Sequence, residues 1–232
     1  MNASRLDRRL LIFGLTALFA VVAVTPGQAQ DGGKYGNLTA RWWQWVYAQP
    51  AVDTGGTNTN PVLDTTGAHA TAGQEHGIGP GNKFFFLAGT FGGDVTRTVT
   101  VPRGKALFFP VLNIETDNAV DPPTNNKVPK LKALAKASID VATSLYATLD
   151  GHDLEIFRKV SPVFHYTVPD KNSIYDYFGL SGPQFEGTIK PAVGDGYWVH
   201  VPPLAPGHYT LKFGCTTSLG FVLNVTYNLT IQ

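Results

Sequence analysis

Apolar and polar residues alternate in short runs along most of the chain after residue 83, and this alternation predicts β-strands. In the clearest run, residues 95–101, three valines alternate with three threonines, and Arg97 takes the remaining position on the apolar side. An Asp-Gly pair at residues 150–151 lies between two such runs and predicts a hairpin turn. The other predicted strands cover residues 84–88, 106–112, 144–149, 154–159, 187–193, 197–201, 208–213 and 221–231.

Two segments show helical periodicity instead. Residues 37–50 carry three tryptophans, and their apolar side chains recur at the spacing of one helix face before Pro50 ends the segment. Trp43 and Tyr47 add a second apolar stripe, so we expect this helix to dock on a sheet rather than to present a sugar platform. Residues 128–142 predict a second helix, inserted between strands.

These elements predict a mainly β fold. Roughly ten short strands with one inserted helix indicate an antiparallel β-sandwich or jelly roll that begins with the Trp-rich helix. No repeat or linker divides residues 30–232, so we expect one domain there. Residues 51–82 are rich in Gly, Thr, Asn and Pro and predict a long loop, and loops of that length often have a function.

The N-terminal residues have the three parts of a secretory signal. Three arginines precede an apolar run over residues 10–24, and small residues lie at the −3 and −1 positions of a cleavage site after Ala29. The run is too short for the ~20 residues of a membrane span. We therefore expect a signal peptide over residues 1–29 and a secreted or periplasmic protein. Arg8 and Arg9 resemble a twin-arginine signal, but Asp7 before them favours the general secretory route.

Charge excludes two classes of partner. Without residues 1–29 the chain keeps 15 Lys and Arg against 16 Asp and Glu, a net charge of −1. Neither nucleic acid nor an anionic membrane surface is expected to bind such a chain. Cys215 is the single cysteine, so no intramolecular disulfide holds the fold. A buried apolar role for its thiol is favoured over reactivity or pairing between chains.

Three stretches resemble a group of secreted bacterial proteins that have no established activity. They cover residues 86–90, 101–113 and 196–207, and the Trp-rich start and the ending at residues 226–230 extend the likeness over most of the chain. The resemblance implies export and a shared fold. Members of the group often carry a cysteine pair near positions 70 and 99, where this chain has Ala70 and Val99, so that disulfide is absent.

Candidate chemistry centres on an acidic loop over residues 115–121. Glu115, Asp117 and Asp121 supply hard oxygen ligands of the kind that Ca²⁺ prefers, although their spacing is not that of an EF-hand. A solvated loop in which Asp and Asn make local turns is the favoured alternative. If the protein is an enzyme, we expect Glu115, Asp117 and His76 to be catalytic, with paired carboxylates or a metal-bound water acting on an ester, lactone or glycoside.

No other motif specifies a reaction. The six histidines show no zinc-site spacing, Ser181 lacks the surroundings of a nucleophile elbow, and no glycine loop is placed to hold a phosphate. The leading hypothesis is therefore an exported binding module for a glycan, a surface polymer or another protein. A secreted hydrolase that depends on a divalent cation is the first alternative, and a structural subunit of the envelope or matrix is the second.

Overall fold

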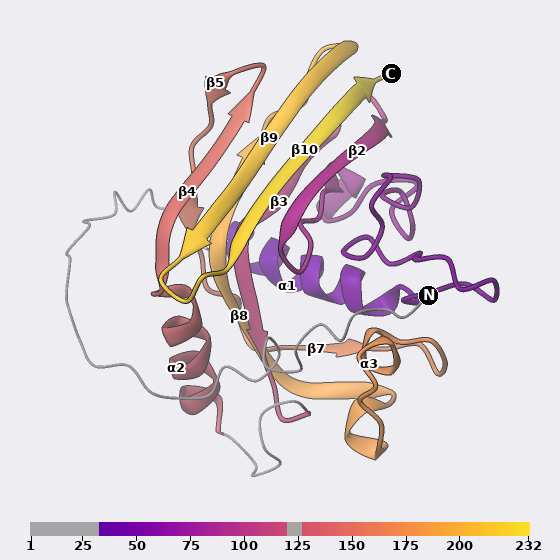
Figure 1. The fold of residues 1–232 in the computed structure, drawn as a ribbon, viewed down its shortest axis with the longest axis vertical. Helices are drawn as coiled ribbons and strands as arrows, with labels where there is room; N and C mark the ends of the chain where they lie inside the picture. Colours follow the sequence, from indigo (N-terminus) through magenta and orange to yellow (C-terminus); the bar gives the residue numbers. More distant parts are fainter. Residues whose placement is uncertain (1–32, 120–126) are drawn as a thin grey trace.

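The computed structural model describes residues 33–119 and 127–232, which form two β-sheets and the helices packed on them (Figure 1). The helices are α1 (Lys34–Ala48), α2 (Val128–Ile139) and the short α3 (Ile174–Tyr177), with 3-10 turns at Pro80–Asn82 and Pro183–Phe185. The strands are β1 (Phe84–Phe86), β2 (Gly93–Val101), β3 (Ala106–Thr116), β4 (Ala142–Leu149), β5 (His152–Asp153), β6 (Phe157–Arg158), β7 (Phe164–Thr167), β8 (Thr188–Val201), β9 (Gly207–Thr217) and β10 (Val222–Ile231).

The expected mainly β sandwich is confirmed, but its sheets are mixed rather than antiparallel. The first sheet has the order β1-β3-β8-β6, with β7 also paired to β8, and the second has the order β2-β10-β9-β4-β5. β1 pairs with β3 in parallel, and β2 pairs with β10 in parallel. Parallel neighbours need a long connection between them. The chain between β2 and β10 is that connection, because it builds most of both sheets before it returns to β2.

The two sheets enclose one hydrophobic core and α1 closes a second. Apolar side chains of β2, β9 and β10 meet those of β1, β3 and β8 between the sheets. The other face of the first sheet carries α1 and the segments around β7 and α3 (Figure 1). The docking expected for the Trp-rich helix is thus observed, and it is fixed by polar contacts. The indole N–H of Trp42 donates to the carbonyl of Leu87, and that of Trp45 to the carbonyl of Ala72.

Several element boundaries differ from the prediction for local reasons. The turn at Asp150 and Gly151 forms as expected, with both residues at positive φ. The run after it does not stay in one sheet, because β5 pairs with β4 while β6 pairs with β8 in the other sheet. The two strands expected over 187–201 are one strand, β8, which continues through Gly194 and Gly196. The inserted helix ends at Ile139 and β4 starts at Ala142.

Arg97 occupies the inward position that the alternation of β2 assigns to it, and its side chain is 1% exposed. Its guanidinium group donates to the carbonyl oxygens of Asp64, Ala88 and Gly89 and to the hydroxyl of Tyr227. The carboxylate of Asp64 in turn accepts hydrogen bonds from the backbone N–H groups of residues 66, 67 and 69. Arg97 therefore ties the long loop over residues 51–82 to the core.

Cys215 is 2% exposed and lies in the core between the sheets, and burial raises the pKa of its thiol to about 11. We expect the folded protein to react with a thiol-specific disulfide reagent at least a hundredfold more slowly than the unfolded protein at pH 8, because the thiolate is the reactive form. The rate should rise with pH until the pH passes about 11. Equal rates in the presence and absence of denaturant would contradict a buried, unreactive thiol.

The predicted signal peptide at residues 1–29 lies outside the described residues, as does Asp121. Within residues 33–119 and 127–232, no helix combines the length and the apolar character needed to cross a membrane.

Candidate functional site

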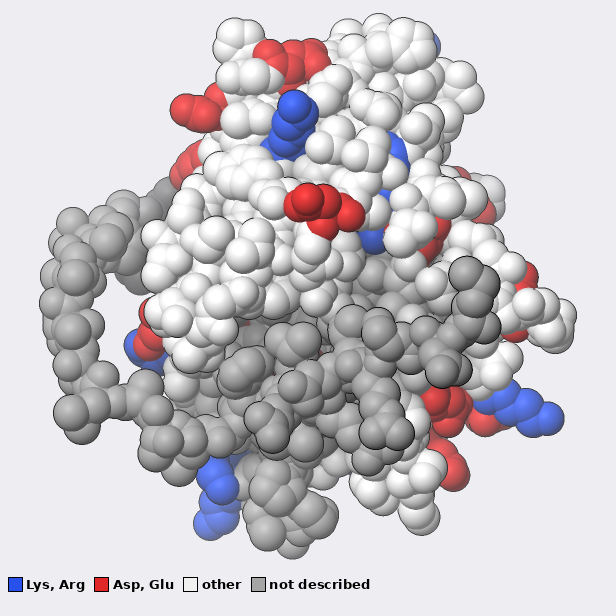
Figure 2. Space-filling view, viewed as in Figure 1, with Lys and Arg blue, Asp and Glu red and all other residues white. Residues whose placement is uncertain are grey.

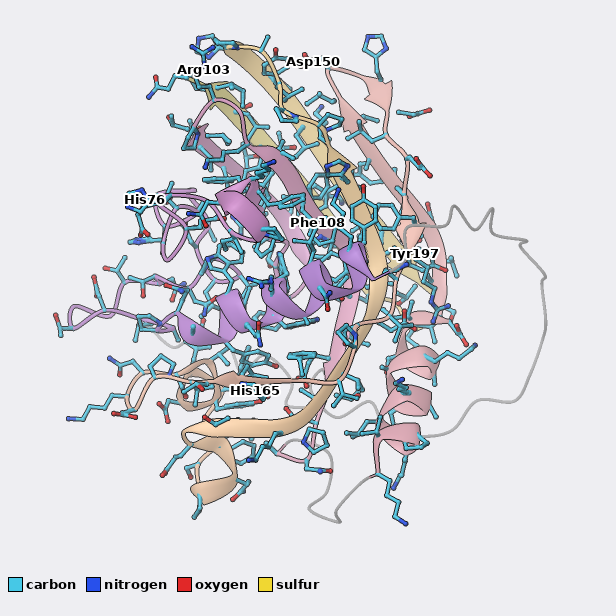
Figure 3. All side chains as sticks on the ribbon, turned by 180° about the vertical axis from the view of Figure 1, so that it is seen from behind. His76, Arg103, Phe108, Asp150, His165 and Tyr197 are labelled. Atoms are coloured by element: carbon cyan, nitrogen blue, oxygen red, sulfur yellow. The ribbon has the colours of Figure 1, made fainter. Side chains whose placement is uncertain are left out.

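Glu115 and Asp117 lie at the far end of β3, where that strand meets α1, β7 and α3. The acidic segment is less of a loop than expected, because β3 continues through Thr116 and so includes Glu115. Three tyrosines approach the two carboxylates from three elements: Tyr47 from α1, Tyr166 from β7 and Tyr175 from α3. Figure 3 shows α1 lying across the first sheet, with β7, which carries the labelled His165, next to it.

Asp117 is buried, with 1% of its surface exposed, and it organises this junction. Its Oδ2 atom accepts hydrogen bonds from the hydroxyls of Tyr166 and Tyr175, the second at 3.2 Å, and these hydroxyls also contact each other. Its Oδ1 atom accepts the backbone N–H of Ala119 at 2.6 Å. Since both carboxylate oxygens are engaged, Asp117 holds β7 and α3 against the end of β3.

Glu115 is half-buried and accepts a hydrogen bond at 3.1 Å from the hydroxyl of Tyr47. The ring of Tyr47 stacks on that of Tyr166 at a centroid distance of 4.0 Å and with that of Trp43 at 5.7 Å. Aromatic rings therefore surround Tyr47, the partner of Glu115, and Trp43 is the ring that contacts the first sheet at Gly194.

Burial and charge keep these tyrosines protonated. Burial is the main cause that raises the pKa values of Tyr47, Tyr166 and Tyr175, and the neighbouring carboxylates raise them further. Each hydroxyl is therefore a neutral hydrogen-bond donor at any physiological pH.

Two glycines of β8 lie at this site, Gly194 directly below Trp43 and Gly196 beside Asn113. Gly194 is registered opposite Glu115 and Gly196 opposite Asn113. A Cβ atom on Gly194 would lie 2.9 Å from the indole nitrogen of Trp43, and one on Gly196 would lie 2.8 Å from the Cβ atom of Asn113. We call the site that these residues surround the glycine notch, and it comprises Trp43, Tyr47, Asn113, Glu115, Gly194 and Gly196.

The glycine notch contains buried donors that lack acceptors. In the described part of the chain, neither Nε1 of Trp43 nor Nδ2 of Asn113 has a hydrogen-bond partner. The same holds for Nε1 of Trp198, which lies two residues beyond Gly196 along β8. A buried donor without a partner costs roughly 1–3 kcal/mol, and such donors are rare in native proteins. Two of these donors belong to residues of the glycine notch, Trp43 and Asn113, and an acceptor from outside the chain would satisfy them.

The structure does not bring His76 to the two carboxylates. The carbonyl of His76 accepts a hydrogen bond from Lys105, the residue immediately before β3. Glu115 lies nine residues along that strand from Ala106, which at about 3.3 Å per residue is roughly 30 Å. Figure 3 shows His76 in the loop before β1, at the other end of the sheet. His76 cannot act together with Glu115 and Asp117.

The calcium site stays a prediction. Among residues 33–119 and 127–232, no three His, Cys, Asp or Glu side chains are grouped so that they could hold a metal ion. The predicted ligand set of Glu115, Asp117 and Asp121 includes one residue outside those ranges. The two described members are engaged by tyrosine hydroxyls, and the oxygens of Asp117 accept from three donors.

Sequence reasoning found the carboxylates of this site but missed its other members. Trp43 and Tyr47 have the helical spacing of a core stripe, and nothing in that spacing separates a ring over a glycine floor from an ordinary packed ring. One signal for the site was available in the sequence: Gly194 and Gly196 lie two residues apart in an apolar strand. Glycine inside a strand often marks a place where another group approaches the backbone closely.

No protein-family model matches this sequence, and the comparison with curated proteins gives no match either. The function must therefore be inferred from the residues of the site.

Proposed function

We propose that the protein binds a neutral, hydroxyl-bearing ligand, a sugar unit of a glycan, in the glycine notch. The observation that carries this proposal is the pair of buried donors without partners, Nε1 of Trp43 and Nδ2 of Asn113, above a glycine floor and beside the carboxylate of Glu115. A sugar hydroxyl can accept from such N–H groups and donate to a carboxylate in the same site.

The charges of the site favour a neutral ligand. Glu115 and Asp117 lie two residues apart at the end of β3, so a phosphate or carboxylate ligand would be repelled. The unpartnered N–H groups of the indole and the amide require an acceptor, which a bare cation does not provide. A hydroxyl group both donates and accepts hydrogen bonds. It can therefore accept from the N–H groups of Trp43 and Asn113 and donate to the carboxylate of Glu115.

The aromatic rings support the same chemistry. Trp43 and Tyr47 are stacked and both remain partly exposed, as do Asn113 and Glu115, so parts of these residues lie at the protein surface although the two donor atoms are buried. Aromatic faces pack well against the apolar faces of sugar rings, because they offer a large rigid surface at little cost in side-chain entropy.

Binding is favoured over hydrolysis because the two carboxylates are not equivalent. Glycoside hydrolysis needs one carboxyl group to give a proton and another to act as a base or nucleophile. Asp117 accepts hydrogen bonds on both oxygens in a buried position and is held as an acceptor. This leaves Glu115 as the one carboxylate at the glycine notch within the described residues.

The proposal is tested by titrating the protein with soluble neutral oligosaccharides built on glucose, mannose, galactose or N-acetylglucosamine, and following tryptophan fluorescence and binding heat. We expect at least one of them to bind and to change the fluorescence. Trp43→Phe, which keeps the ring and removes the donor, and Glu115→Gln, which keeps the shape and removes the charge, should each weaken binding at least tenfold.

Arg41→Ala is the matched control, because Arg41 lies exposed on the same helix, and its affinity should equal that of the unmodified protein. Gly194→Ala places a methyl group against the indole nitrogen and should also abolish binding while the fold is kept. The proposal is overturned if no oligosaccharide in the panel binds, or if Trp43→Phe and Glu115→Gln both bind as tightly as the control.

A further inference from the structure

The second sheet exposes one whole face, and its outward side chains are nearly all neutral and polar. On β2 they are Thr96, Thr98 and Thr100, each exposed. On β10 the outward positions alternate between asparagine and threonine from Asn224 to Thr230. Strand β9 continues the face with His208, Thr210 and Lys212. We call this surface the threonine–asparagine face.

The register of the strands makes this face an ordered array. Thr96 pairs with Thr226, Thr98 with Asn228, and Thr100 with Thr230. Paired residues lie about 4.8 Å apart across the strands, and successive outward residues about 6.6 Å apart along them. Threonine is β-branched and has few rotamers, so its hydroxyl groups are already ordered before any ligand binds.

Charge is sparse on this face. Along the outward positions of β2 and β10 the single ionisable side chain is Asp94, and it accepts a hydrogen bond at 2.7 Å from the amide of Asn224. Figure 2, drawn from the side on which the second sheet faces the viewer, shows a largely uncharged surface over these strands where grey atoms do not cover it.

An aromatic ring lies flat at one end of the array. Tyr146 of β4 is registered beside Gly214 of β9, and a Cβ atom on Gly214 would lie 2.7 Å from the ring of Tyr146. The hydroxyl of Tyr146 donates to Asn224 at 3.0 Å, which holds the ring against the sheet. The residue is nevertheless 38% exposed. Its outer face is thus available for stacking, next to the polar groups of β10.

Two shallow, open depressions lie on the array. One shallow hollow of about 370 Å³ is lined by Asp94, Thr96, Asn224 and Thr226. Another of about 270 Å³ is lined by Thr98, Asn228 and residues of β9. Successive pairs of β2 and β10 line them, so they adjoin. From Asp94 to Thr100 the strip covers six residue steps, which is roughly 20 Å.

We propose that the threonine–asparagine face binds an extended, uncharged polysaccharide chain, with one sugar ring stacked on Tyr146 and its neighbours hydrogen-bonded along β2 and β10. A hydroxyl-rich polymer matches side chains that both donate and accept, and the strip is long enough for several sugar units. A polyanion would find too few cations there, since β2, β9 and β10 turn outward only Lys212 and His208, together with the carboxylate of Asp94. This inference concerns a second surface and does not depend on ligand binding in the glycine notch.

The experiment is a depletion isotherm of the purified protein on insoluble neutral polysaccharides, namely cellulose, chitin and a β-1,3-glucan, with insoluble pectate as the polyanion. We expect retention on at least one neutral polymer and none on pectate. Tyr146→Ala should lower the affinity at least tenfold, whereas Tyr146→Phe keeps the ring and should lower it less than threefold. Thr98→Glu combined with Thr226→Glu should also abolish retention through desolvated charge.

Tyr177→Ala is the control, because Tyr177 is 46% exposed but belongs to α3, away from this face. Trp43→Phe is the second control. It should weaken ligand binding in the glycine notch but leave retention on the solid polymer unchanged, so it separates the two proposals. Thermal melting of each variant checks folding. The paired glutamates, at the exposed Thr98 and the half-buried Thr226, keep the test valid if Tyr146→Ala unfolds. Absence of retention on all neutral polymers, retention on pectate alone, or full retention by the paired glutamate variant would overturn the proposal.

Discussion

Replacing Arg97 with methionine is expected to lower the free energy of unfolding by roughly 3 kcal/mol, since two backbone carbonyls, those of Asp64 and Gly89, lose the guanidinium donor while they remain buried. The carbonyl of Ala88 also loses that donor but keeps the hydroxyl of Tyr227. Methionine has a similar length and fills the volume, so a cavity adds little. At about 2–4 °C for each kcal/mol in a protein of this size, the melting temperature should fall by roughly 10 °C.

The matched control for Arg97 is Arg103→Met. Arg103 is exposed at the turn after β2, so its replacement should change the unfolding free energy by less than about 0.5 kcal/mol. Urea unfolding of both variants provides the measurement. If the two midpoints agree within error, then Arg97 does not anchor the loop over residues 51–82, and its burial has another cause.

Asp117→Ala should have the second largest effect, a loss of roughly 3 kcal/mol. The change removes the acceptor of two buried tyrosine hydroxyls and of the Ala119 N–H. Tyr166 and Tyr175 still contact each other, so one hydroxyl proton and one backbone N–H are left without an acceptor. Tyr175→Phe should cost only about 1 kcal/mol, because Asp117 keeps Tyr166 and Ala119.

A double-mutant cycle gives this second prediction its sharpest form. If Asp117 and Tyr175 belong to one hydrogen-bonded network, the combined variant should be less destabilised than the sum of the single variants. Asp153→Ala, at an exposed position on β5, is the control and should be nearly neutral. Additive effects of Asp117→Ala and Tyr175→Phe would mean that the carboxylate and the hydroxyl stabilise the protein separately.

Local patterns anticipated most of the secondary structure. Alternation placed Val95, Val99 and Arg97 on one face of a strand, and the structure has all three buried. The Asp150-Gly151 turn and the docking of the Trp-rich helix also follow from residues close together in the sequence. Such features depend on side-chain period and turn geometry, which a few neighbouring residues are sufficient to specify.

The candidate site could be predicted in part. The carboxylates of Glu115 and Asp117 stood out because charged residues are sparse in the chain, and the structure places both at one junction. The partners of these carboxylates could not be predicted. Tyr47 comes from α1, far earlier in the chain, and Tyr175 from a helix of four residues that has no readable period.

By itself, then, the sequence determined most of the strands, the two longer helices and the presence of a single cysteine, since each depends on local period or on composition. The tertiary structure alone decided that β2 lies parallel to β10, that His76 is far from Glu115, and that Gly194 lies beneath Trp43. The reason is physical: pairing of strands and contact of helix with sheet join residues over a hundred positions apart, and the free energy of such contacts depends on the packing of the whole chain.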